Sequence, residues 1–205
     1  MELRDVVARR RMVRAFTDEP VPPAAVDRML AHAVRAPSAG FSQGWAFLVL
    51  DTPDAVARFW AATTPPGRSA APDRWIAGMR RAPVLIVPLA REAAYRERYA
   101  EADKARGGEP QDPRERWGVP YWFVDTGMAA LLALLTAVDE GLGACFFGVP
   151  AARVPALREA FGVPEDHEPV GAIAVGHPAP AQAVRGSGAR RRRRPLEEVV
   201  HRGRW

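Results

Sequence analysis

The sequence predicts an α+β fold in which helices flank a mixed β-sheet. Short apolar runs bounded by turn residues, which are typical of buried strands, alternate with segments whose apolar residues recur at helical spacing. These elements do not repeat a strand–helix–strand unit, and no Gly-x-Gly-x-x-Gly motif follows a predicted strand. A doubly wound dinucleotide-binding sheet is therefore not supported, and helices packed on a mixed sheet fit the order better.

The length and composition of the chain favour one globular domain over residues 1–205. With 205 residues, of which 48% are hydrophobic, the chain can bury a sizeable core. No run reaches the roughly 20 consecutive apolar residues of a membrane helix, and the charged N-terminus does not have the pattern of a secretory signal. The single cysteine, Cys145, cannot form an internal disulfide and is expected to be a buried, inert thiol. We therefore expect a cytoplasmic protein with no membrane partner.

The first half of the chain predicts four helices and two strands. Leu3 and Val7 mark a short first helix. The second helix begins at the prolines of "PVPPAAVDRMLAHAV", where a missing N–H costs nothing, and is expected to end at Pro37. The run "WAFLVL" is expected to form the first strand. Further helices are expected at residues 54–62 and 73–81, and a second strand is expected at residues 83–89.

The second half begins with a polar segment, residues 91–118, which we expect to be variable and lid-like. It combines a charged helix candidate with a loop rich in glycine and proline. The most hydrophobic helix follows at residues 123–138 and belongs in a core or a subunit interface. Strands are expected at residues 144–148 and 169–178 with a short helix between them, and an amphipathic piece closes the chain.

Aromatic and acidic residues lie around the start of this hydrophobic helix. For Trp117, Tyr121 and Trp122, packing beneath the lid-like segment is the favoured interpretation, and stacking on a flat substrate is the alternative. Asp125 and Asp139 are far apart on one helix, so they do not form an obvious acid–base pair. The four histidines show no ligand spacing, so no metal site is predicted.

Arginine clusters near both ends are candidate anion-binding residues. The net charge is +5, yet Lys104 is the only lysine, so the basic composition reflects an arginine bias and is weak evidence for function. Clustering is a separate observation, because arginines gather in residues 9–14 and 190–194. Planar guanidinium groups from both ends are suited to hold one phosphate between them. A solvated surface is the alternative, and it is the commoner role of a charge run.

Two glycine-containing segments are candidate walls of a ligand site. The stretch "APSAGFSQGW" follows the second predicted helix, and its small residues let the backbone approach a flat polar ring closely. The stretch "GLGACFFGV" offers backbone amides and two aromatic rings. Taken alone, each has a simpler interpretation, an ordinary helix-to-strand loop for the first and a buried strand for the second.

Taken in order, these segments resemble the FMN-dependent nitroreductase family. The matching stretches are "RRMVRAF", "APSAGFSQGW", "GLGACFFG", "PVGAIAVGHP" and "RRRRPLEEVV" with a terminal "RW". The resemblance covers the first 50 residues and most of the chain from Asp125 onward, and the unmatched middle is where this family varies. It implies an intertwined homodimer with two FMN sites at the interface. NAD(P)H would reduce the flavin, which would then reduce a nitroaromatic, a quinone or another small organic acceptor in a ping-pong reaction.

Carried over residue by residue, the resemblance implies a set of flavin contacts rather than a catalytic residue. Arg14 would act as an electrostatic stabiliser of the reduced ring. The implied contacts are Arg10, Arg11 and Met12 at the phosphate and ribityl chain, Arg14 at the pyrimidine edge, Pro37, Ser38 and Ala39 of the partner subunit together with Phe41 along the ring, Phe146, Phe147 and Gly148 near the flavin N5, and Arg191 and Arg193 at the phosphate.

Three positions depart from the family pattern. Met12 stands where the family has serine, and Phe41 and Gly44 stand where it has asparagine and proline. These changes remove a hydroxyl and a side-chain amide, and Phe41 is expected to stack on the ring or narrow the pocket. The alternatives are a flavin-binding protein without turnover and an arginine-rich nucleic-acid binder. The second is weaker, because the clusters lack interleaved aromatic residues.

Overall fold

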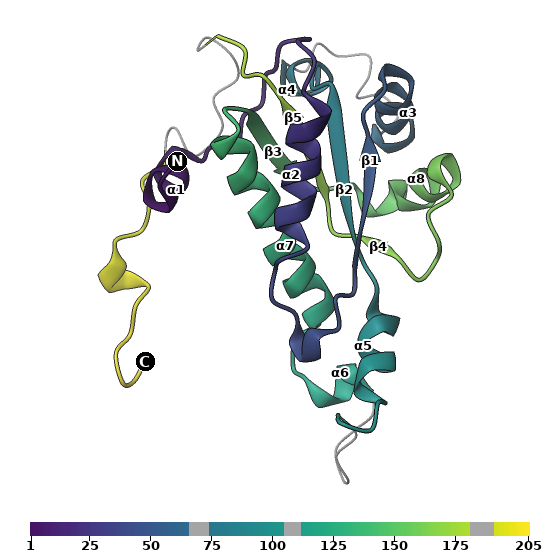
Figure 1. The fold of residues 1–205 in the computed structure, drawn as a ribbon, viewed down its shortest axis with the longest axis vertical. Helices are drawn as coiled ribbons and strands as arrows, with labels where there is room; N and C mark the ends of the chain where they lie inside the picture. Colours follow the sequence, from purple (N-terminus) through teal and green to yellow (C-terminus); the bar gives the residue numbers. More distant parts are fainter. Residues whose placement is uncertain (66–73, 105–111, 181–190) are drawn as a thin grey trace.

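The computed structural model describes residues 1–65, 74–104, 112–180 and 191–205, and it is built on one central β-sheet (Figure 1). The strands follow the order β1-β2-β5-β3, and β4 pairs with β2. All pairings between these strands are antiparallel, while an isolated bridge from Met12 to Ala144 runs parallel. The α+β prediction is therefore confirmed. The bounds are Trp45–Leu50 for β1, Val84–Ala90 for β2, Gly143–Phe147 for β3, Glu168–Pro169 for β4 and Ala172–Gly176 for β5.

Helices α2 (Pro23–Ala33) and α7 (Tyr121–Asp139) lie side by side over one face of the sheet (Figure 1). Small residues of α7, such as Ala130 and Ala133, let α2 approach closely and surround its buried Met29. With 19 residues, α7 is about 28 Å long at the usual rise per residue. Helix α7 therefore runs along the sheet, and its first and last turns lie at opposite ends of the sheet.

The opposite face of the sheet is covered by α3 (Pro53–Thr63), α4 (Arg74–Met79) and α8 (Val154–Phe161). The hydroxyl of Thr52 accepts a hydrogen bond from the Ala55 amide, which satisfies a free donor at the start of α3. Phe59 of α3 is fully buried in the apolar cluster on this face of the sheet. The sheet thus lies between two apolar clusters, and side chains of each strand alternate between them.

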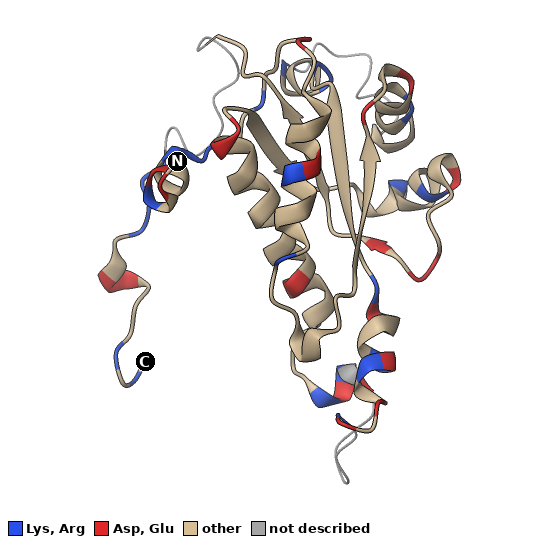
Figure 2. Ribbon diagram, viewed as in Figure 1, with Lys and Arg blue, Asp and Glu red and all other residues tan. Residues whose placement is uncertain are grey.

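Charged residues gather on α5 (Glu92–Tyr99) and α6 (Pro113–Arg116), beyond the end of the sheet (Figure 2). These helices belong to the segment 91–118, whose residues 105–111 lie outside the described part of the chain. The charged helix that the sequence predicts at the start of this segment covers residues 91–106, but in the structure α5 already ends at Tyr99. The favoured packing of the aromatic cluster is observed, because Trp117 contacts the rings of Tyr95, Tyr99 and Tyr121 at centroid distances of 6.5, 4.7 and 5.3 Å.

The second helix ends earlier than predicted, at Ala33 rather than Pro37. The amides of Arg35 and Ala36 still form turns, donating to the His32 and Ala33 carbonyls at 3.0 and 3.1 Å. A residue that precedes proline disfavours the helical conformation, so the chain leaves the helix before Pro37 is reached.

The two ends of the chain lie away from the sheet. Helix α1 (Leu3–Arg9) contacts α7, and the amino group of Met1 pairs with Asp139 at the end of that helix. All described residues of the C-terminal tail, 191–205, are exposed, and the predicted amphipathic piece forms only the single turn η4 (Leu196–Glu198). The tail therefore presents its apolar residues, including Trp205 at 99% exposure, to solvent.

Helix α7 also leaves part of its apolar surface uncovered. Within the described residues it is the helix that is long and apolar enough to cross a membrane, judged by length and composition alone. Half of its apolar stretch is buried inside the protein, as in the core helix of a soluble domain. On the other side, Val124 and Leu131 are 43% and 47% exposed. This face of α7 is therefore partly apolar and open to solvent.

Candidate functional site

The N-terminal arginine segment is fixed along strand β3. The Val13 amide donates to the Ala144 carbonyl at 3.0 Å, and the Phe146 amide donates to the sulfur of Met12 at 3.4 Å. Met12 also packs against both apolar clusters. The methionine that replaces the family's serine is therefore an anchor for this segment, which holds the flanking arginines at one edge of the sheet.

The guanidinium groups of this segment have no acidic partners. Arg10 and Arg14 are half-buried and Arg11 is exposed, and none of them pairs with a carboxylate within the described residues. By contrast, Arg28 and Arg91 bind carboxylates in bidentate fashion. A half-buried cation without a counter-ion is suited to receive an anionic ligand.

Arg14 is held more firmly than its neighbours. Its Nη1 donates to the Met12 carbonyl at 2.9 Å. Its own carbonyl packs against Gly78 on α4, so closely that a Cβ on Gly78 would collide with it. Backbone and side chain of Arg14 are thus both fixed, which places a permanent positive charge beside β3.

The second candidate segment is the loop of residues 37–44, which we call the flavin loop because the resemblance to the nitroreductase family implies that it lines the cofactor. It contains the turn η1 (Ala39–Phe41) and is tied to two helices. The Ala39 amide donates to Oδ2 of Asp125 on α7 at 2.8 Å, and Nε of Arg98 on α5 donates to the Gly40 carbonyl at 2.8 Å. The loop is therefore an ordered wall rather than a free linker.

The glycines of the flavin loop are explained by tyrosines of α5. A Cβ on Gly40 would lie 2.7 Å from the Tyr99 ring, and a Cβ on Gly44 would collide with the Tyr95 ring. Gly44, which stands where the family has proline, is thus required by the buried Tyr95. Between the two glycines the loop is strained, because Phe41 adopts a left-handed φ of 59°.

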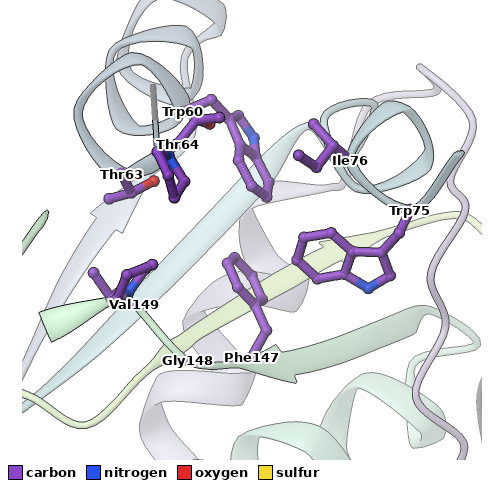
Figure 3. A pocket seen from close by; sticks show the side chains of 10 residues that line it. Trp60, Thr63, Thr64, Trp75, Ile76, Phe147, Gly148 and Val149 are labelled. Carbon is purple, nitrogen blue, oxygen red and sulfur yellow. The ribbon is translucent and has the colours of Figure 1, made fainter. Parts of the chain in front are cut away.

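The aromatic pair of β3 divides between the two faces of the sheet. Phe146 packs with the α2 and α7 cluster, whereas Phe147 points to the other face. There Phe147, Trp60 and Trp75 line a cavity of about 70 Å³ (Figure 3). The two rings therefore point to opposite faces of the sheet. The exposed Gly148 follows, and a Cβ there would meet nothing within 4 Å, so open space borders the backbone.

The predicted site residues fall into separate groups. Arg10, Arg11, Met12 and Arg14 lie together against β3, while the flavin loop lies at the other end of α7 (Figure 1). Arg191 and Arg193 lie on the exposed tail, and Arg190 is outside the described residues. Within one chain the structure does not bring the loop and the arginines to one point.

Asp125 and Tyr95 are the functional candidates that the sequence interpretation missed. Asp125 is 1% exposed and accepts hydrogen bonds from the Ala39 amide and the Tyr95 hydroxyl. A signal was available, because an acidic residue within an apolar core helix must have partners. The sequence interpretation considered Asp125 only as an acid–base partner of Asp139.

Cys145 is buried as predicted, and His32 is exposed. Cys145 is buried, and burial raises the pKa of its thiol, which keeps it protonated and unreactive. His32 lies on the surface of α2, where its Nδ1 is 2.9 Å from the Thr136 hydroxyl. In the described residues no group of acidic, histidine or cysteine side chains is arranged to hold a metal ion.

Comparison with known proteins identifies the family. The model of the Nitroreductase family matches residues 7–177. A Methanothermobacter thermautotrophicus protein, provisionally named NADH dehydrogenase/NAD(P)H nitroreductase, is 26% identical over 181 residues, covering 87% of this chain and 78% of the relative.

Solved structures show the same fold. Bacillus megaterium NfrA2 has a TM-score of 0.73 at 21% identity, covering all of this chain and 75% of that one. A provisionally named nitroreductase from Desulfovibrio desulfuricans, crystallised with FMN, has a TM-score of 0.69 at 24% identity, covering 100% and 98% of the two chains. The family match confirms the resemblance inferred from the motifs and the prediction that the protein is an oxidoreductase. The chain belongs to the nitroreductase family.

Proposed function

We propose that this protein is an FMN-dependent oxidoreductase that accepts hydride from NADH or NADPH. It would pass the electrons to a nitroaromatic, a quinone or another small organic acceptor in a ping-pong reaction. The observation that carries this proposal is the set of Arg10, Arg11 and Arg14, which have no carboxylate partner within the described residues and flank the bridge to β3, the strand that ends just before the open backbone at Gly148. Family membership and the FMN-bound structural neighbours support it.

The residues fit FMN in charge and in shape. Guanidinium groups without acidic partners match the phosphate, and a glycine bordered by open space lets the backbone approach a flat ring. We assign Arg10, Arg11, Arg191 and Arg193 to the phosphate, and Arg14 to the pyrimidine edge. The ring would lie between the backbone around Gly148 and Pro37, Ser38 and Ala39 of the partner subunit, with Phe41 at its margin.

When bound, the flavin supplies the hydride chemistry, and the protein orients it and stabilises charge. Arg14 contributes a fixed positive charge where negative charge develops on the reduced ring, and its bond to the Met12 carbonyl keeps that charge in place. No proton transfer by a protein side chain is required.

We further propose that the protein is a homodimer with sites at its interface. Three apolar surfaces support this arrangement: the exposed side of α7, with Leu131 at 47%, the outer face of α1, with Leu3 at 71%, and the tail, with Leu196 at 74%. A second copy would cover them. It would also explain why one chain separates the flavin loop from the arginines, since each site would take its loop from the partner.

The remaining assignments follow from this function. We treat residues 1–205 as one flavin-binding domain with residues 91–118 as its lid-like part. A reduced nicotinamide co-substrate and a lone cysteine both suit the cytoplasm. The arginine clusters are assigned to the cofactor, so neither nucleic acid nor a membrane is expected as a partner.

The test is the visible absorption spectrum of the purified protein before and after anaerobic addition of NADPH, with NADH in a parallel sample. We expect flavin bands that bleach with one or both donors. Bands that persist would favour a flavin-binding protein without turnover. A colourless protein that FMN does not reconstitute would contradict the proposal.

A further inference from the structure

We infer that Asp125 is a positioning residue for the cofactor, and that it acts by holding the flavin loop together with Tyr95. The inference rests on the proposed function, because the loop is a cofactor wall only if FMN binds there. It concerns residues that do not themselves touch the flavin. Asp125 lies behind the loop, on α7, and Tyr95 lies on α5.

The contacts of Asp125 have the geometry of an anchor. Its Oδ2 accepts from the Ala39 amide at 2.8 Å and from the Tyr95 hydroxyl at 2.7 Å. The side chain is 1% exposed, and in the described part of the chain no cation pairs with it. A buried carboxylate is tolerated only where hydrogen bonds compensate its desolvation. The Ala39 amide and the Tyr95 hydroxyl both donate to Oδ2, so this single atom joins the loop, α5 and α7.

Tyr95 is suited to be a permanent donor in this arrangement. It is fully buried, and burial, together with the hydrogen bond to Asp125, raises the pKa of its hydroxyl well above the ordinary range. The hydroxyl therefore remains a protonated donor at neutral pH. The Tyr95 ring also packs directly on Gly44. One residue thus holds the end of the loop by contact and its start through Asp125.

The strain in the loop explains why such an anchor is needed. Phe41 and Gln43 have φ values of 59° and 50°, in the left-handed region that side chains other than glycine rarely adopt. Strained conformations persist only where surrounding contacts over-determine them. Two hydrogen bonds supply that constraint, one donated by the Ala39 amide to Asp125 and one donated by Arg98 to the Gly40 carbonyl. Without them the loop is expected to relax and to lose the shape that faces the flavin.

The experiment compares Asp125→Ala, Asp125→Asn and Tyr95→Phe with the unaltered chain. Amide hydrogen exchange at Ala39 in the FMN-free protein reports the anchor itself, and titration with FMN gives the dissociation constant. We expect Asp125→Ala to weaken FMN binding about tenfold or more and to accelerate exchange at Ala39. Tyr95→Phe is expected to have a smaller effect of about threefold. Asp125→Asn is expected to bind FMN about as tightly as the unaltered chain, because the asparagine carbonyl oxygen still accepts both hydrogen bonds.

Thr136→Val is the matched control. It removes a buried hydroxyl from the same helix, α7, at the end remote from the loop, where Thr136 contacts His32. We expect it to lower stability without changing FMN affinity or exchange at Ala39. If Asp125→Ala fails to fold, Tyr95→Phe decides the same question.

The outcomes separate the inference from the function on which it rests. An unaltered chain that does not bind FMN would refute the proposed function. An unaltered chain that binds FMN, with Asp125→Ala and Tyr95→Phe variants that match it in affinity and exchange, would refute the inference alone. Equal weakening by Thr136→Val would refute it as well, since the effect would then be general destabilisation.

Discussion

The indole ring of Trp60 and the phenyl ring of Phe147 stack with centroids 5.4 Å apart and planes 4° from parallel. Trp75 meets the Phe147 ring edge-on at 5.8 Å, which closes one side of the cavity in Figure 3. The ring of Phe147 therefore belongs to the aromatic packing beneath α3 and α4. If residue 147 borders the proposed flavin site, we expect it to do so through its backbone rather than its side chain.

Replacing Phe147 by alanine tests this division. We expect the free energy of unfolding to fall by about 2–3 kcal/mol, because a ring packed between two tryptophans is lost. FMN affinity of the folded protein is expected to stay unchanged. Chemical denaturation and FMN titration measure the two effects. Phe147→Leu should retain more stability, and a variant that keeps its stability but loses FMN would show that the ring itself contacts the cofactor.

Replacing Arg14 by alanine is expected to slow flavin reduction more than it weakens flavin binding. Its charge acts mainly after hydride has arrived, so the rate should fall by about 10- to 100-fold. Anaerobic stopped-flow with NADPH or NADH gives the rate, and titration of the FMN-free protein gives the affinity. Arg28→Ala, which removes a surface arginine paired with Glu140, is the control. Equal losses of rate and affinity would contradict the proposed role of Arg14 in stabilising the reduced flavin.

Replacing Arg10 and Arg193 together by alanine is expected to release FMN. Both would bind the phosphate, and each charge-assisted contact contributes about 1.5–3 kcal/mol, so affinity should fall by two orders of magnitude or more. The control is the double variant Arg28→Ala with Arg81→Ala, which removes the same charge from arginines paired with Glu140 and Asp18. Retention of FMN by the Arg10 and Arg193 variant would show that the phosphate assignment is wrong.

Replacing Phe41 by asparagine is expected to stabilise the protein by about 0.5–1 kcal/mol, because asparagine tolerates the left-handed backbone at this position. Little burial is lost, since the Phe41 side chain is 71% exposed. The midpoint of thermal unfolding measures the change. Phe41→Ala is the matched control, because it removes the ring without offering a residue that favours this conformation. Equal effects of the two variants would mean that backbone strain is not responsible.

The ion pairs around Glu92 predict a loss of stability in acid. Hydrogen bonds from Arg114 and Arg96 lower the pKa of Glu92 below its ordinary value. The folded state thus binds the proton less tightly than the unfolded state. The stabilisation is fully present above the ordinary pKa near 4.5 and is lost as the pH falls through the lower folded value. Thermal unfolding of Glu92→Gln should match that of the unaltered protein in acid and lie below it at neutral pH.

Much of this architecture could be predicted from local sequence. The apolar runs at β1 and β2 and the long helix α7 were found because periodicity and turn residues determine them locally. The role of Asp125 could not be found in this way, since it depends on a tyrosine thirty residues away in a variable segment. The opposite orientation of Phe146 and Phe147 follows from strand alternation, yet which face each ring takes is set by packing, against the α2 and α7 cluster for Phe146 and against Trp60 for Phe147.

The contact of α5 with Gly40 and Gly44 bears on how such a protein diversifies. Helix α5 rests, through Tyr95 and Tyr99, on the loop assigned to the cofactor. Under the proposed function, substitutions in α5 would reshape the wall facing the flavin and leave the arginines as they are. A protein of this design would then adapt to a new electron acceptor at a distance from the residues assigned to the phosphate.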